Sequence, residues 1–139
     1  MAQARNTATT KQQTTPEELP DAELEVLACL WQRGPATAAE IRDWLEPFRP
    51  LAHGSVLTLL KRLRERGLVT REKSGRGKAF VFRPTQRPRP AYRRILGRLT
   101  RRVFGGDPVT VVASLLESRA PTPAEIRRIR QLLDDLERE

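Results

Sequence analysis

The chain has 139 residues, of which 38% are hydrophobic and 31% are charged, so it can bury a small core beneath a highly charged surface. One cysteine cannot form an internal disulfide or a cysteine zinc site, and one histidine argues against most metal centres and histidine-based catalysis. No apolar run approaches the roughly 18 residues of a membrane span, and the N-terminus has no signal-like apolar stretch. We therefore expect a cytoplasmic protein with no membrane partner, no cofactor and no metal.

The positive charge is concentrated in one part of the chain. The net charge is +9, but residues 52–105 hold 16 of the 26 Lys and Arg residues and 2 of the 17 Asp and Glu residues. That segment carries +14 and the remainder carries −5. A basic segment in an otherwise acidic chain indicates a polyanionic partner, although a merely solvated basic surface is the alternative.

The N-terminal part predicts a disordered tail and then a helix. Residues 1–18 are rich in Thr and Gln and nearly lack large apolar side chains, so they are expected to be disordered. A helix is predicted over 21–33, with an apolar stripe at Leu24, Leu27, Ala28 and Trp31. Cys29 falls away from this stripe, so it is either an exposed thiol or, as we favour, packed against a neighbouring segment.

Two further helices follow. Thr37 and Glu40 have the spacing of a capping box, which predicts a second helix that ends near Pro47. Its expected inward residues are Ile41, Trp44 and Leu45. The third helix is predicted over 52–66, with Val56, Leu59, Leu60 and Leu63 inward and Gly67 at its C-terminus.

The periodicity then changes from helical to alternating. Residues 68–73 and 79–83 read as two strands, joined by a turn over 74–78 that contains two glycines and two cations. Three helices followed by a basic-tipped hairpin predict a winged helix-turn-helix domain over 19–84. The expected fold class is mainly α with a small β-hairpin.

The C-terminal part, 85–139, predicts a helical dimerisation domain. A Pro-rich connector precedes helices expected over 91–104, from Asp107-Pro108, and from the capping box Thr122–Glu125. Each helix is too short to bury its apolar stripe alone, so a second copy is the favoured partner, and folding back on the first domain is the alternative. The predicted dimerisation residues are Leu99, Val103, Val112, Leu116, Ile129, Leu133 and Leu136.

One face of the third helix remains free once its core residues are assigned. In a helix-turn-helix protein the start of this helix enters the major groove. Small, hydroxyl-bearing or apolar residues there fit base edges and thymine methyl groups. The predicted base-reading residues are His53, Gly54, Ser55, Leu57 and Thr58.

Four cations are expected to contact the DNA backbone. Lys61 and Arg62 lie one turn later on the third helix, and Arg76 and Lys78 lie in the hairpin turn. The alternatives are a solvated helix face and a solvated turn. Neither a glycine-rich phosphate loop nor a catalytic constellation stands out in the sequence, so no enzyme is expected.

These segments together resemble the penicillinase repressor family, the transcriptional regulators of the BlaI/MecI type, which also includes copper-responsive repressors. The resemblance covers about residues 19–138. It rests on the motifs DAELEVL with LW at 21–31, GPATAAEI at 34–41, SVLTLLKRL at 55–63, ERGLV at 65–69, FGG at 104–106 and TPAEI at 122–126.

The resemblance implies a homodimer whose winged helices bind a palindromic operator and repress β-lactamase-type or related stress genes. In its best-known branch, a sensor-linked protease relieves repression by cutting the C-terminal domain. Three departures stand out. Gly54-Ser55-Val56 replaces the usual Ser-Thr-Val, Ser114-Leu115 stands where that branch has its Asn-Phe cleavage pair, and the cysteine pairs of the copper-responsive branch are missing.

The sequence thus favours a DNA-binding repressor acting on double-stranded operator DNA. The rival interpretation is a winged-helix module whose basic face binds an acidic protein. Steep loss of DNA binding with salt, together with preference for one palindrome, would distinguish the two.

Overall fold

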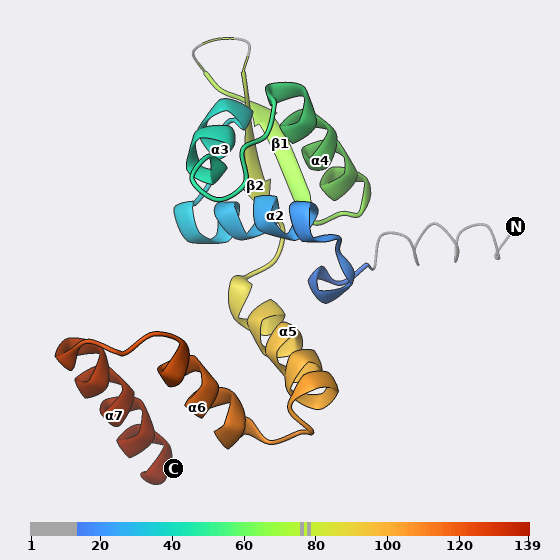
Figure 1. Ribbon diagram of the computed structural model, residues 1–139. Coiled ribbons are helices and arrows are strands. Elements are labelled where there is room, and N and C mark those ends of the chain that lie inside the picture. The colour runs from blue at the N-terminus through green and yellow to red at the C-terminus, as the bar shows by residue number, and fades with distance from the viewer. Residues whose placement is uncertain (1–13, 76, 78) are drawn as a thin grey trace, which may run out of the picture. The chain divides into compact units, whose positions relative to one another are not determined.

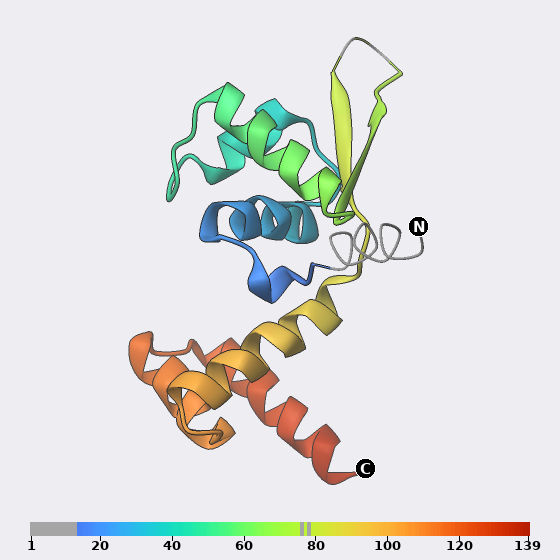
Figure 2. The same cartoon turned by 90° about the vertical axis from the view of Figure 1, so that its right-hand side faces the viewer.

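The computed structural model describes residues 14–75, 77 and 79–139. The chain forms two compact units, the first ending at Ile95 and the second spanning Leu96–Glu139. The first unit begins with the short 3-10 helix η1 (Pro16–Glu18) and continues through α2 (Asp21–Arg33), α3 (Ala38–Leu45) and α4 (His53–Glu65). It then forms the strands β1 (Val69–Lys73) and β2 (Phe80–Pro84), and α5 (Pro88–Val103) leads into the second unit. Figures 1 and 2 show the strand pair beside the three helices.

The second unit contains the C-terminal half of α5, together with α6 (Pro108–Ser118) and α7 (Pro123–Glu137). Asp107 caps α6 by accepting a hydrogen bond from the Val109 amide, with Pro108 in the first turn. Thr122 and Glu125 form the predicted capping box of α7, and Thr37 and Glu40 form that of α3. The predicted fold class, mainly α with one β-hairpin, is confirmed.

A single-residue bridge that the sequence did not reveal joins the hairpin to the loop before α3. β1 and β2 pair antiparallel with Arg71 opposite Phe82. Ala36, in the loop before α3, exchanges both backbone hydrogen bonds with Phe82, at 3.1 and 2.8 Å. This bridge fixes the hairpin to the start of α3, so the wing and the helix-turn-helix form one packed unit.

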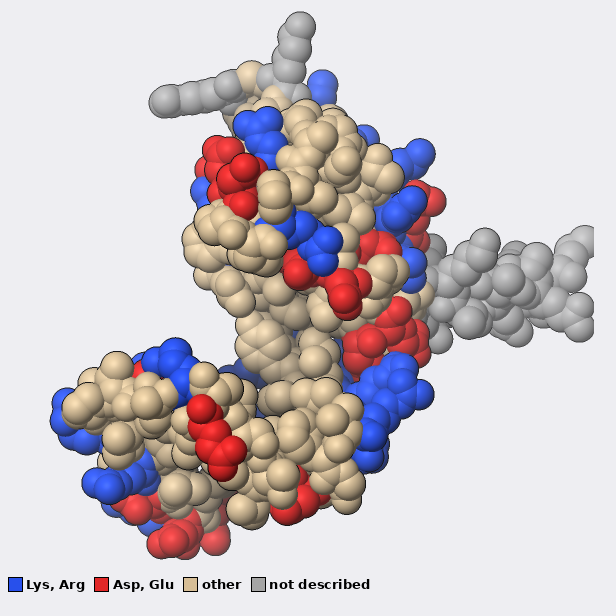
Figure 3. Space-filling model, viewed as in Figure 1, with Lys and Arg blue, Asp and Glu red and all other residues tan. Residues whose placement is uncertain are grey.

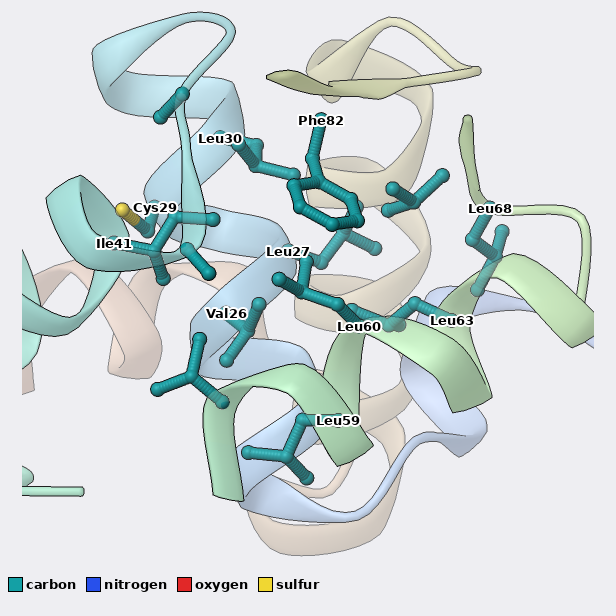
Figure 4. Packing of buried hydrophobic residues seen from close by; sticks show 14 of the residues in the cluster. Val26, Leu27, Cys29, Leu30, Ile41, Leu59, Leu60, Leu63, Leu68 and Phe82 are labelled. Atoms are coloured by element: carbon teal, nitrogen blue, oxygen red, sulfur yellow. The ribbon is translucent and has the colours of Figure 1, made fainter. Parts of the chain in front are cut away.

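The core of the first unit lies between α2, α3, α4 and the hairpin. Its fully buried side chains include Leu27, Leu30, Ile41, Leu45, Val56, Leu60 and Leu63. Figure 4 shows Phe82 of β2 pointing toward Leu27 and Leu30 of α2. The helices and the hairpin therefore share one hydrophobic cluster.

Several expectations about side-chain burial were wrong. The buried face of α2 runs through Val26, Leu27 and Leu30, and Cys29 is buried beside them, so the favoured interpretation of Cys29 as packed is confirmed. Leu24 and Trp31 are only partly buried at its edge. The predicted stripe covered only part of this face, at Leu27, because α2 packs on more than one neighbour, which widens its buried arc. Trp44 was predicted inward but is 43% exposed, since the short α3 buries only its Ala38, Ile41 and Leu45 side.

The boundaries also shift in places. Residues 16–18, counted with the disordered tail, form η1, and Pro16 is buried. Glu17 accepts a hydrogen bond from Arg94 of α5 at 3.2 Å, which holds η1 in place. α5 starts at Pro88, inside the stretch expected to be a connector, because proline is accepted in a helix's first turn. Residues 1–13 of the predicted tail lie outside the described residues, and the predicted domain boundaries stay predictions.

Candidate nucleic-acid interface

Helix α4 is anchored along one face and open along the other. Val56, Leu60 and Leu63 are fully buried, and Leu59 is nearly so. The face opposite consists of exposed residues, and it includes every predicted base-reading residue and both predicted backbone cations of this helix: His53, Gly54, Ser55, Leu57, Thr58, Lys61 and Arg62. The hydrophobic core therefore holds α4 in place and leaves a continuous polar face for a ligand.

Two features of the first turns of α4 favour close approach by a partner. A Cβ atom added at Gly54 would meet nothing within 4 Å, so the protein's own packing does not require glycine there. The Thr58 hydroxyl donates to the Gly54 carbonyl at 3.0 Å, so its oxygen remains available as an acceptor and its methyl group for apolar contact. Both features suit the edge of a base pair in the major groove.

A shallow hollow adjoins this face where α3, α4 and the hairpin meet. Its walls are apolar side chains such as Leu57, Phe80 and Phe82, and it is flanked by His53 and Arg71. The Arg71 guanidinium lies 4.0 Å from the centre of the Phe80 ring, in a cation–π contact. The sequence alone does not reveal this contact, because cross-strand neighbours are unknown until the register of the hairpin is known.

Some cations around the interface are paired with carboxylates and others are not. Lys61 and Arg62 form no ion pair with any residue in the described part of the chain, so their charges are free to meet phosphates. Arg83, by contrast, donates to Glu72 at 2.7 Å, which offsets much of its charge locally. Figure 3 shows Lys and Arg side chains along the α4 edge of the first unit. The predicted wing cations Arg76 and Lys78 lie outside the described residues.

The ion pair between Glu23 and Arg66 fixes the far end of α4. Glu23 of α2 is buried, and its carboxylate accepts from Arg66 Nε at 3.2 Å, just past the end of α4. A buried carboxylate needs such a partner to offset its lost hydration. This contact and the α2–α4 core packing together fix the angle at which α4 presents its open face.

The second unit has no hydrophobic core of its own. No residue of α6 or α7 is buried. Six of the seven predicted dimerisation residues are exposed, Leu99, Val103, Val112, Leu116, Leu133 and Leu136, and Ile129 is partly buried. Four more exposed apolar residues on the same helices lie outside the predicted dimerisation set, Leu96, Val109, Leu115 and Leu132. Val109 and Leu115 belong to α6, which is apolar on most sides and therefore shows no distinct stripe in the sequence.

Local contacts nevertheless hold the connection between α6 and α7. Both guanidinium nitrogens of Arg119 bond the Glu125 carboxylate, at 3.2 and 2.8 Å. These bonds and that from the Thr122 amide lower the pKa of Glu125 to about 2. The unit is therefore ordered by caps and ion pairs while its apolar side chains remain uncovered.

The described residues contain no cluster of three potential metal-ligating side chains. Over the same residues, no helix is long and apolar enough to cross a membrane.

Comparison with known proteins identifies the family. The sequence profile described as penicillinase repressor matches residues 19–135. An uncharacterized 16.5 kDa protein of Latilactobacillus sakei, from the ptsI 3′ region, is 26% identical over 116 residues, covering 84% of this chain and 78% of that protein.

Two solved structures are also similar. The DNA-binding domain of the repressor BlaI is 27% identical and has a TM-score of 0.45, covering 52% of this chain and 87% of that domain. A mutant of MarR from Escherichia coli, complexed with operator DNA, is 15% identical with a TM-score of 0.52, covering 97% of this chain and 91% of MarR. The likeness to MarR shows the winged-helix fold. With most of its length matched by the family profile, this chain belongs to the penicillinase repressor family and is a winged-helix, DNA-binding transcriptional regulator.

Proposed function

We propose that this protein represses transcription by binding a palindromic operator as a homodimer, with α4 as the helix that reads the bases. The single observation that carries the proposal is the division of α4 into a fully buried face and a fully exposed one. A helix anchored in this way can enter the major groove without rearrangement of its own domain.

Within this proposal, the residues of α4 have different roles. His53, Gly54, Ser55, Leu57 and Thr58 face the base edges and supply the sequence preference. Lys61 and Arg62 neutralise phosphates, and Arg76 and Lys78 of the wing do the same beside the site. Most of the affinity then comes from phosphate contacts and falls steeply with salt.

The second unit is proposed to supply the dimer. Its exposed apolar residues include Val109, which is 73% exposed, and Val103, which is 67% exposed. Burying a Leu or Val side chain contributes roughly 1.5–3 kcal/mol, so ten such residues left in water represent a large unrealised stabilisation. A second copy offers the same apolar surface and gives a closed, two-fold assembly that matches a palindrome.

Release of the operator by a sensor-linked protease is a further possibility within the family. The residues that align with the cleavage pair, Ser114 and Leu115, lie inside α6, where Ser114 Oγ donates to the Thr110 carbonyl at 2.8 Å. A helical segment must open locally before a protease can bind it in extended form. Cleavage at this bond would therefore depend on partial unfolding of α6.

Selection of sites from a random-sequence duplex library, followed by footprinting, tests the proposal directly. A palindromic consensus whose half-sites are protected together is the expected result. Sedimentation of the full chain should give a dimer at micromolar concentration. Selection of no consensus, or a monomer bound to an unpaired half-site, would contradict it. Weak DNA binding with no preference for a palindrome would instead favour an acidic protein as the partner.

A further inference from the structure

Helix α5 carries a dense set of arginines that the proposed operator contact does not use. Seven arginines fall between residues 87 and 102, and the chain has no Asp or Glu between Glu72 and Asp107. The helix itself runs unbroken from Pro88 to Val103. In Figure 3, Lys and Arg side chains gather along one side of α5.

The arginines and the apolar residues occupy different sides of this helix. With 3.6 residues per turn, Tyr92, Ile95, Leu99 and Val103 share one side. Arg93, Arg98 and Arg101 point to the opposite side. The apolar side is partly covered already, because the Tyr92 ring packs edge-on against Trp31 with centroids 5.7 Å apart. The remaining apolar residues, Leu99 and Val103, lie on the side of the helix away from Arg101.

Within the described residues, the charges of this face are almost unpaired. Arg94 donates to Glu17 at 3.2 Å, and it is the one α5 arginine with an ion pair there. The arginines also stand four residues apart in several places, as at Arg94 and Arg98, and like charges at that spacing destabilise a helix. The isolated chain therefore contains an unfavourable charge arrangement that a polyanion would relieve.

Gly97 leaves room for the arginines on this face. It lies mid-helix, where glycine is unfavourable, between Arg93 and Arg101 on the arginine side. A Cβ atom placed there would come 3.2 Å from Arg101 Nη1. The missing side chain lets the guanidinium lie close along the helix surface, where a flat anionic surface can reach it.

We propose that the arginine face of α5 is a second DNA-binding surface, which contacts backbone phosphates without sequence preference. A guanidinium group can donate two parallel hydrogen bonds to the oxygens of one phosphate, in a bidentate geometry. The span from Arg89 to Arg102 is about 20 Å by helix rise, which corresponds to about six phosphates along one strand. An anionic membrane fits less well, since an interfacial helix inserts its apolar side and Tyr92 is already packed on Trp31.

This surface goes beyond operator reading by α4, and the two can be tested separately. The test variant is Arg93→Gln with Arg98→Gln and Arg101→Gln, since glutamine removes the charge, stays polar and favours helix. Its matched control is Arg127→Gln with Arg128→Gln and Arg130→Gln, which removes the same charge from exposed positions of α7. Both sets are placed in full-length protein that also carries Lys61→Gln and Arg62→Gln, so that the α4 contribution is reduced.

Binding to a random-sequence duplex is measured by fluorescence anisotropy over a series of salt concentrations. The α5 triple variant should lose about 2.7 units of the slope of log K against log salt, at roughly 0.9 unit per phosphate contact. The α7 control should lose less than one unit. The single variant Arg101→Gln, which removes one charge, should lose about one unit.

Equal losses in the α5 and α7 variants would show a net-charge effect and overturn the proposal, as would an unchanged slope in the α5 triple. If the triple variant is folded by circular dichroism but monomeric by sedimentation, these arginines instead contact the second copy in the dimer. Loss of binding to phosphatidylserine vesicles with unchanged DNA binding would assign them to a membrane. The operator proposal is tested separately in the unsubstituted protein. It fails if that protein binds all DNA sequences equally well.

Discussion

Replacing Gly54 with valine should separate folding from DNA recognition. Gly54 lies in the first turn of α4, and a Cβ there would meet nothing within 4 Å. Valine is itself a better helix former than glycine, so the free energy of unfolding should change by less than about 0.5 kcal/mol. In the complex, the added side chain would stand between the helix and the base edges. Overpacking of that kind costs about 1–3 kcal/mol, or roughly a 5- to 150-fold loss in operator affinity.

The matched control is Ala124→Val, at the same position of the first turn of α7 and likewise exposed. Urea unfolding measures stability, and anisotropy on the selected operator and on random DNA measures binding. The Gly54 variant should lose operator affinity and keep most of its random binding, while the control should keep both. If Gly54→Val binds the operator as tightly as the original protein, the start of α4 does not enter the groove closely, and the assignment of the base-reading residues is wrong.

Four further outcomes are expected. Thr58→Ala should cost about 1–3 kcal/mol on the operator, measured by titration, and little on random DNA; equal losses on both would remove Thr58 from the specificity set. Arg76→Ala with Lys78→Ala should weaken binding to both DNAs and lower the salt slope by roughly one unit per lost phosphate contact, so an unaltered slope would exclude a wing contact. Removal of residues 105–139 should leave a folded monomer by sedimentation, with affinity lower by orders of magnitude, and a truncation that still dimerises would place the interface elsewhere. Burial raises the pKa of the Cys29 thiol to about 11 despite nearby Arg33, from an ordinary 9.0, so the stability to urea should decline as the pH rises from 9 toward 11, while the thiol contributes no pH dependence below pH 9; rapid alkylation of the native protein at pH 8 would contradict this burial.

The sequence by itself determined the order of elements and the exposed face of α4. Capping residues act within three or four positions, so Thr37 and Thr122 marked the starts of α3 and α7 correctly. The apolar spacing in α4 identified Val56, Leu60 and Leu63 as core, and the residues between them were then left for a ligand. Local hydrogen bonding and helical periodicity are short-range properties, which is why one sequence sufficed.

Only the tertiary structure decided which side chains meet across the chain. The Ala36–Phe82 bridge and the buried Glu23–Arg66 pair join residues 46 and 43 positions apart, and no local pattern encodes such contacts. The burial of Cys29 and the exposure of Trp44 depend on how many neighbours each helix packs against, rather than on its own periodicity. Long-range packing decides these features, because the segments that surround a side chain are distant from it in the sequence.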